Sequence, residues 1–137
     1  MSTPLDQLKS VDLSHLSKEE AKEFTILLEE LEKREKRESS MASFYDFVKA
    51  IWPEFIAGAH HKKMAEAFDK IASGESKRLI INMPPRHTKS EFASYLFPAY
   101  LLGKRPKLKI IEATHTADLA INFGRRVRDL LESEEYA

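Results

Sequence analysis

The chain has 137 residues, of which 42% are hydrophobic and 32% charged, and its 22 basic residues balance 22 acidic ones. This composition is too apolar for a fully disordered chain, and no apolar run approaches the roughly 20 residues of a membrane span. The absence of cysteine excludes disulfides and cysteine-based zinc sites. We expect no secretory signal, since the first residues lack a basic stretch followed by an apolar core.

Residues 1–40 are expected to form a helical, charged arm. Ser17 to Glu20 has the S-x-x-E pattern of a capping box, which predicts a helix start. Apolar residues follow at helical spacing, namely Phe24, Leu27, Leu28 and Leu31. The polar end of this segment places a soft boundary near residue 40. Its alternating charges favour a solvated face over a nucleic-acid-binding arm.

A second unit, residues 41–137, begins with two predicted helices. Ser43 is placed to cap a short helix that Pro53 ends or kinks. Residues 59–73 predict a longer helix, and Gly74 suits the position after its end. The apolar face of this longer helix consists of Met64, Ala67, Phe68 and Ile71.

Two short apolar runs, residues 78–82 (RLIIN) and 108–111 (LKII), predict buried strands. Between them we expect a helix over roughly 89–102, kinked at Pro98 and ended by Gly103. With a further helix after the second run, this order predicts a parallel α/β sheet with a right-handed crossover. Because two strands make a poor sheet, we expect the chain to be the front part of something larger.

The last predicted helix is capped by Thr116 or Asp118. Its apolar stripe consists of Leu119, Ala120, Phe123, Val127, Leu130 and Leu131. The arginines on this helix, Arg125, Arg126 and Arg128, have two interpretations: one of them contacts DNA or a neighbouring subunit's nucleotide, or they form a solvated face. His115 is either a sensor at a strand end or an ordinary loop histidine.

The candidate site lies in residues 82–91, NMPPRHTKSE. Phosphate binding needs converging backbone N–H groups, a helix start, a lysine and a hydroxyl for magnesium, and Lys89 and Ser90 supply the last two. Both glycines of the Walker A pattern are missing, and Thr88 stands at the second. Pro85 has no N–H and Thr88 resists positive φ, so we expect a stiff loop in which Arg86 replaces lost donors. The residues alone leave open a proline turn with an exposed Lys-Ser.

From about residue 51 onward the chain resembles the large terminase subunit of tailed bacteriophages. The resemblance lies in RLIINMPPRHTKS, FPAYLLGKRPKLKII and ATHTADLAINFGRRVRDLLESEEY. It implies a partial P-loop NTPase fold of the ASCE type, without the Walker B strand and the nuclease domain. It also implies ATP and Mg²⁺ as cofactors, with Lys89 on the β- and γ-phosphates, Ser90 on the metal and Arg86 as an arginine finger in cis. The implied cofactor-binding residues are Pro85, Arg86, His87, Thr88, Lys89, Ser90 and Glu91, with His61 near the adenine.

The implied function is ATP binding for the ATP-driven packaging of viral DNA into procapsids, in the host cytoplasm. The complete protein, an ATPase and endonuclease, would work with double-stranded DNA, the portal protein and the small terminase subunit, as a homo-oligomeric ring. Without a Walker B base we expect this chain alone to bind nucleotide weakly, with no appreciable turnover. The alternatives are another P-loop motor, such as a helicase-like ATPase, and a non-catalytic interaction module with a vestigial loop.

Overall fold

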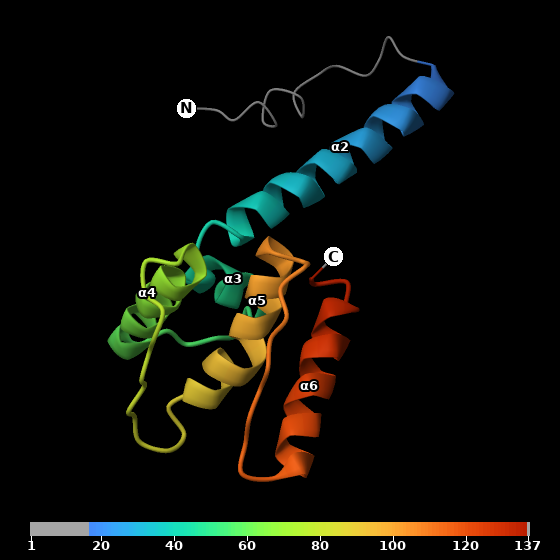
Figure 1. Cartoon of the computed structure of the whole chain (residues 1–137). Helices are drawn as coiled ribbons and strands as arrows, with labels where there is room; N and C mark the ends of the chain where they lie inside the picture. Colours follow the sequence, from blue (N-terminus) through green and yellow to red (C-terminus); the bar gives the residue numbers. More distant parts are fainter. Residues whose placement is uncertain (1–16, 137) are drawn as a thin grey trace. The chain divides into compact units, whose positions relative to one another are not determined.

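The computed structural model describes residues 17–136, and every regular element in this range is a helix (Figure 1). The elements are α2 (Lys18–Ser40), α3 (Phe44–Ile51), α4 (Ala59–Ser73), the π-helical segment η2 (Glu91–Leu96), α5 (Phe97–Lys104) and α6 (Ala117–Leu131). The chain divides into two compact units between residues 39 and 40. Among the described helices, none combines the length and the apolar character that a membrane crossing requires.

Helix α2 starts at the predicted capping box. The Ser17 N–H donates to Glu20 Oε2 (2.9 Å), and the Glu20 N–H donates to Ser17 Oγ (3.3 Å). These reciprocal bonds satisfy two donors at the helix start. The bond from the Ser17 N–H to the Glu20 carboxylate lowers the pKa of Glu20, because it favours the ionised form. No described side chain of α2 is buried. The helix therefore rests on local capping and propensity rather than on burial.

The ends of α3 and α4 follow the predicted signals. Ser43 Oγ accepts the Asp46 N–H (3.1 Å) and donates to Asp46 Oδ2 (2.6 Å), which caps α3, and this helix ends just before Pro53. Gly74 follows α4 in the left-handed conformation with φ 84°, which glycine adopts without a Cβ clash. Both helices are thus bounded by residues whose local chemistry stops or starts a helix.

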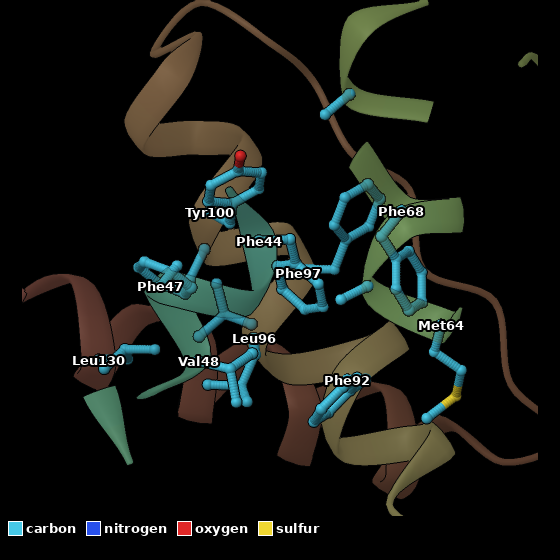
Figure 2. Close-up of a cluster of buried hydrophobic side chains, with 14 residues drawn as sticks. Phe44, Phe47, Val48, Met64, Phe68, Phe92, Leu96, Phe97, Tyr100 and Leu130 are labelled. Carbon is cyan, nitrogen blue, oxygen red and sulfur yellow. The ribbon is translucent and has the colours of Figure 1, made fainter. Parts of the chain in front are cut away.

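Aromatic side chains from several helices build the hydrophobic core. Phe44 of α3 lies at its centre, with its ring edge-on to Phe68, Phe92 and Phe97 at centroid distances of 5.1, 5.5 and 5.4 Å. Figure 2 shows these rings gathered in one cluster between the helices, with Leu130 of α6 at the margin. Fully burying one such side chain contributes about 1.5–3 kcal/mol, and edge-to-face pairs add to this. The core therefore holds α3, α4, η2, α5 and α6 together.

Asp69 of α4 makes the polar contacts at the edge of this core. Its Oδ1 accepts the backbone N–H of Phe44 (2.9 Å) and the hydroxyl of Tyr100 (3.1 Å). The Phe44 N–H is at the start of α3 and has no partner within that helix. Tyr100 is fully buried, and this burial, followed by the nearby charge of Asp69, raises the pKa of its phenol well above the ordinary value. Asp69 thus ties together α3, α4 and α5.

The predicted helix over 89–102 is confirmed, and the helical run extends from Lys89 to Lys104. Its η2 part is π-helical: the Phe97 N–H donates to Phe92 O, five residues back. This wider turn lies immediately before Pro98, which has no N–H and crowds the preceding turn. The π turn accommodates the proline where the helix continues.

Gly103 does not end this helix, contrary to prediction. It lies inside α5, where an added Cβ would come within 2.5 Å of the Tyr136 hydroxyl oxygen and 2.8 Å of Met41 Cε. The Tyr136 hydroxyl donates to the Ala99 carbonyl (2.8 Å). The absence of a Cβ at Gly103 leaves room for the ends of the Tyr136 and Met41 side chains against α5.

The predicted parallel α/β sheet, and with it the partial ASCE-type P-loop NTPase fold, is wrong for the described residues. Residues 78–82 and 108–111 form no strand and are irregular connections between helices (Figure 1). Ile80 is 85% exposed and Ile111 93% exposed. A strand pair needs an apolar surface to pack on, and two parallel strands alone are marginal. Aromatic residues from the helices fill the core instead, and these isoleucines remain outside it.

Helix α6 is capped by Thr116, which settles the choice between the two predicted caps. Thr116 Oγ1 accepts the Leu119 N–H (3.4 Å). The predicted apolar stripe is confirmed at Phe123, Val127 and Leu130, which are all buried. The face that carries these residues packs against η2 and α5.

Candidate functional site

The segment PPRHTKS, residues 84–90, bends sharply before the helix that starts at Lys89. Among the described non-glycine residues, only Arg86 (φ 64°) and Thr88 (φ 56°) have positive φ. Left-handed residues alternating with ordinary ones turn successive N–H groups toward one side, an arrangement that binds anions. The conformation that Thr88 was predicted to resist is therefore the one it adopts.

Such a conformation carries a cost for these residue types. A non-glycine residue in the left-handed region is strained by about 1–3 kcal/mol and stays there only where its surroundings fix it. A β-branched residue at positive φ is a genuine outlier. At Thr88, side-chain hydrogen bonds to His61 and to the His87 carbonyl fix the conformation.

The Thr88 side chain is held by His61 at the start of α4. The Thr88 hydroxyl donates to the His87 carbonyl (2.7 Å), and its oxygen lies 2.7 Å from His61 Nε2. Because the hydroxyl proton is already used, the Thr88 oxygen accepts the proton of Nε2–H. His61 Nδ1 in turn accepts the Gly58 N–H (2.8 Å). Both ring nitrogens are thereby engaged, which identifies His61 as the neutral Nε2–H tautomer.

The His61 ring sits in apolar surroundings and is only 7% exposed. Phe55 and Phe92 pack against it at centroid distances of 4.7 and 5.5 Å. This burial, and then the nearby His60 and His87, lower the pKa of His61 below its ordinary value. The neutral form that the hydrogen bonds require is therefore also the form that the environment favours.

The remaining predicted site residues lie at the surface of the same segment. Lys89 Nζ folds back to 3.4 Å from the Pro84 carbonyl, and His87 Nδ1 donates to the Pro85 carbonyl (2.9 Å). The side chains of Arg86 and Ser90 are exposed. The structure therefore gathers the residues predicted from the PPRHTKS pattern on one bend, with the cationic groups accessible from solvent.

Glu91, the last residue of the predicted set, has a protein partner. Its carboxylate accepts two bonds from Arg126 of α6, at 3.0 and 2.5 Å. The Arg126 guanidinium also lies over the Tyr95 ring, 4.2 Å from its centroid. Arg126, for which the sequence left open a DNA contact or a solvated face, therefore holds α6 against η2.

The other candidates from the sequence lie apart from this contact. Arg128 pairs with the adjacent Asp129 (2.6 Å), and Arg125 is exposed on α6. His115 is exposed in the connection before α6. The sensor role proposed for His115 depended on a strand end, and that strand does not form in the described residues.

The contacts of Thr88 with His61 and of Glu91 with Arg126 were not predicted. They join residues 27 and 35 positions apart, and the sequence carries no periodic signal for them. Within residues 17–136 there is no cluster of three His, Asp or Glu side chains arranged to hold a metal. A Mg²⁺ ion at Ser90 would take most of its ligands from phosphate oxygens and water, as Mg²⁺ commonly does.

A cleft of about 590 Å³ lies elsewhere, at the ends of α4 and α5. It is lined by Ala42, Asp69, Ala72, Ser73, Lys104 and Arg105. Arg105 Nη2 is engaged there by the Ala72 carbonyl at 2.8 Å. No residue of the predicted site lines this cleft.

A scan against protein-family models, a search of curated proteins and a search of solved structures each found no match to this chain. The site is therefore interpreted from its own residues and geometry.

Proposed function

We propose that residues 84–90 bind the phosphates of ATP together with Mg²⁺, and that the chain supplies this ATP-binding segment to a DNA-packaging motor of the terminase type. One observation carries the proposal. Arg86 and Thr88 are the described non-glycine residues with positive φ, and they directly precede a helix that starts with Lys89 and Ser90. This is the backbone shape, helix start and side-chain pair that phosphate binding requires.

The side chains divide the work by their chemistry. Lys89 supplies a compact positive charge for the β- and γ-phosphates, and only a long bond to the Pro84 carbonyl competes for its ammonium. Arg86 adds a fork of N–H donors that suits phosphate oxygens. This fork compensates for Pro84 and Pro85, which donate no N–H. Ser90 offers its exposed hydroxyl to Mg²⁺.

Binding without appreciable hydrolysis is the expected behaviour of this chain alone. Hydrolysis needs a carboxylate or similar group to orient the attacking water. Glu91 is the carboxylate nearest in sequence to Lys89 and Ser90, and Arg126 occupies both of its oxygens. Turnover would therefore depend on a group from elsewhere in the assembled motor.

The wider setting of the proposal rests on the terminase resemblance. Double-stranded DNA, the portal protein and the small terminase subunit are the proposed partners of the complete motor, a homo-oligomeric ring in the host cytoplasm. A non-catalytic interaction module is the second candidate. The observation behind it is that Ile80 and Ile111, at 85% and 93% exposure, leave large apolar side chains open to a partner.

The test is a calorimetric titration of the chain with ATP and Mg²⁺. Lys89→Ala is expected to weaken binding about tenfold or more, since a hydrogen bond to a charged group contributes roughly 1.5–3 kcal/mol. Lys107→Ala is the matched control, because Lys107 is an exposed lysine outside the site. An absence of ATP binding in the unmodified chain, or equal losses in the two variants, would refute the proposal and favour the interaction module.

A further inference from the structure

The His61 ring connects two backbone segments that are distant in sequence. Its Nδ1 accepts the Gly58 N–H at the start of α4, and its Nε2–H reaches the Thr88 hydroxyl oxygen (2.7 Å). Phe55 and Phe92 both pack against the ring. This connection, the His61 bridge, therefore ends on Thr88, whose backbone has an unfavourable positive φ.

We propose that His61 is a positioning residue, which in its neutral Nε2–H form holds Thr88 in the left-handed conformation and so keeps residues 84–90 in their phosphate-binding shape. This proposal rests on the proposed function. His61 does not touch the phosphates in this arrangement. Its ring nitrogens are occupied by Gly58 and Thr88, so it acts through the backbone of the loop.

The same contacts make the arrangement dependent on pH. A proton added to Nδ1 would face the Gly58 N–H, so two donors would be opposed at 2.8 Å and that bond would be lost. The titratable groups facing the ring are His60 on α4 and His87 in the loop, while Phe55 and Phe92 are apolar. Protonation of His60 or His87 adds repulsion to a protonated His61. The loop should therefore lose its shape as the pH falls below the ordinary pKa of histidine, about 6.5.

Two substitutions separate the bridge from the packing of the ring. His61→Phe keeps an aromatic ring against Phe55 and Phe92 but removes both hydrogen bonds. It should weaken binding of ATP and Mg²⁺ about three- to tenfold, the equivalent of one or two neutral hydrogen bonds. His61→Gln keeps a donor near the Nε2 position and does not titrate, so binding should be largely retained and its decline at acidic pH should disappear.

Thr88 provides the complementary half of the test. Thr88→Val keeps the shape of the side chain but removes the hydroxyl, whereas Thr88→Ser keeps the hydroxyl. Val should weaken ATP binding as His61→Phe does, and Ser should preserve it. The double variant His61→Phe/Thr88→Val should lose less binding than the sum of the two single variants, since both remove the bond between His61 and Thr88. Fully additive losses would contradict the bridge.

NMR of the chain without nucleotide tests the bridge independently of ATP binding. Two-bond nitrogen–proton spectra should show His61 as the Nε2–H tautomer near neutral pH, and backbone couplings should place Thr88 at positive φ. Both signatures should be lost at acidic pH. In the His61→Phe variant, the Thr88 couplings that report positive φ should also be lost. Thr88 remaining left-handed in His61→Phe would overturn this proposal. If the NMR signatures appear but the chain does not bind ATP, the proposed function fails and the bridge stands only as a loop-ordering contact.

Discussion

Glu91 and Arg126, 35 residues apart in sequence, form a two-pronged ion pair that joins η2 to α6. The planar guanidinium fork matches the two carboxylate oxygens, which fixes the relative orientation of the side chains. Both side chains are 37% exposed, so solvent screens part of the attraction. The pair therefore positions the helix start that carries Ser90 more than it stabilises the fold.

A double-mutant cycle measures this ion pair. Glu91→Gln, Arg126→Gln and the double variant should show a coupling of about 1 kcal/mol in urea unfolding, at the upper end for an exposed pair because of the fork geometry. Arg128→Gln is the control, because its partner Asp129 is its sequence neighbour on the exposed side of α6. It should change stability little. Strictly additive effects of the Glu91 and Arg126 substitutions would contradict a persistent pair.

Two glycine-to-alanine substitutions should change stability in opposite directions. Gly74 has φ 84° after α4, so Gly74→Ala should destabilise the chain by about 1–2 kcal/mol. Gly124 lies inside α6 with open space around an added Cβ, so Gly124→Ala should stabilise by about 1 kcal/mol. Thermal unfolding followed by circular dichroism measures both. Shifts of the same sign would mean that α4 does not end as described.

The raised pKa of Tyr100 predicts a loss of stability in alkali. The unfolded phenol releases its proton near pH 10, whereas the buried phenol beside Asp69 keeps its proton to higher pH. The folded state then binds more protons than the unfolded state, so the free energy of unfolding falls as the pH rises above about 10. Urea unfolding over this range should show a steeper decline for the unmodified chain than for Tyr100→Phe. Parallel declines would contradict the burial of the phenol.

Two substitutions at Arg86 distinguish the cost of backbone strain from the contribution of the guanidinium to ATP binding. Its φ of 64° suits glycine, so Arg86→Gly should be more stable than Arg86→Ala by about 1 kcal/mol. Both variants lose the guanidinium, so both should bind ATP more weakly than the unmodified chain and to a similar extent. Chemical unfolding and calorimetric titration of the pair measure the two effects. Equal stability of the alanine and glycine variants would show that Arg86 does not hold positive φ.

The helices were largely predictable because their ends depend on nearby residues. Ser17, Ser43 and Gly74 cap or end helices through contacts within a few positions, and such chemistry can be read from the sequence. The strands were predicted wrongly because apolar, β-branched composition shows only that a segment can pair. Whether residues 78–82 and 108–111 do pair depends on non-local partners, and the aromatic residues of the helices occupy the core instead.

The candidate site likewise has a part that was predictable from the local sequence and a part that was not. Lys89 and Ser90 at a helix start were predictable from the local pattern. The backbone of Thr88 was not, because its intrinsic preference opposes the conformation that it adopts. That preference is overridden by His61, 27 residues away in sequence, and contacts at this separation leave no trace in a single sequence.

The π-helical turn sets the direction in which the start of its helix faces. Each residue of an α-helix advances by about 100° around the axis, and a π turn contains one residue more per hydrogen-bonded ring than an α turn. Lys89 and Ser90 therefore face roughly a quarter-turn away from where an uninterrupted α-helix would point them relative to Phe97 and Tyr100. Deleting one residue from η2 would convert the π turn to an ordinary α turn and leave the lysine and serine facing as they do, because the π turn already takes up one extra residue. A substitution that closes η2 into α-helix at unchanged length would instead turn the loop by roughly a quarter-turn over an unchanged core.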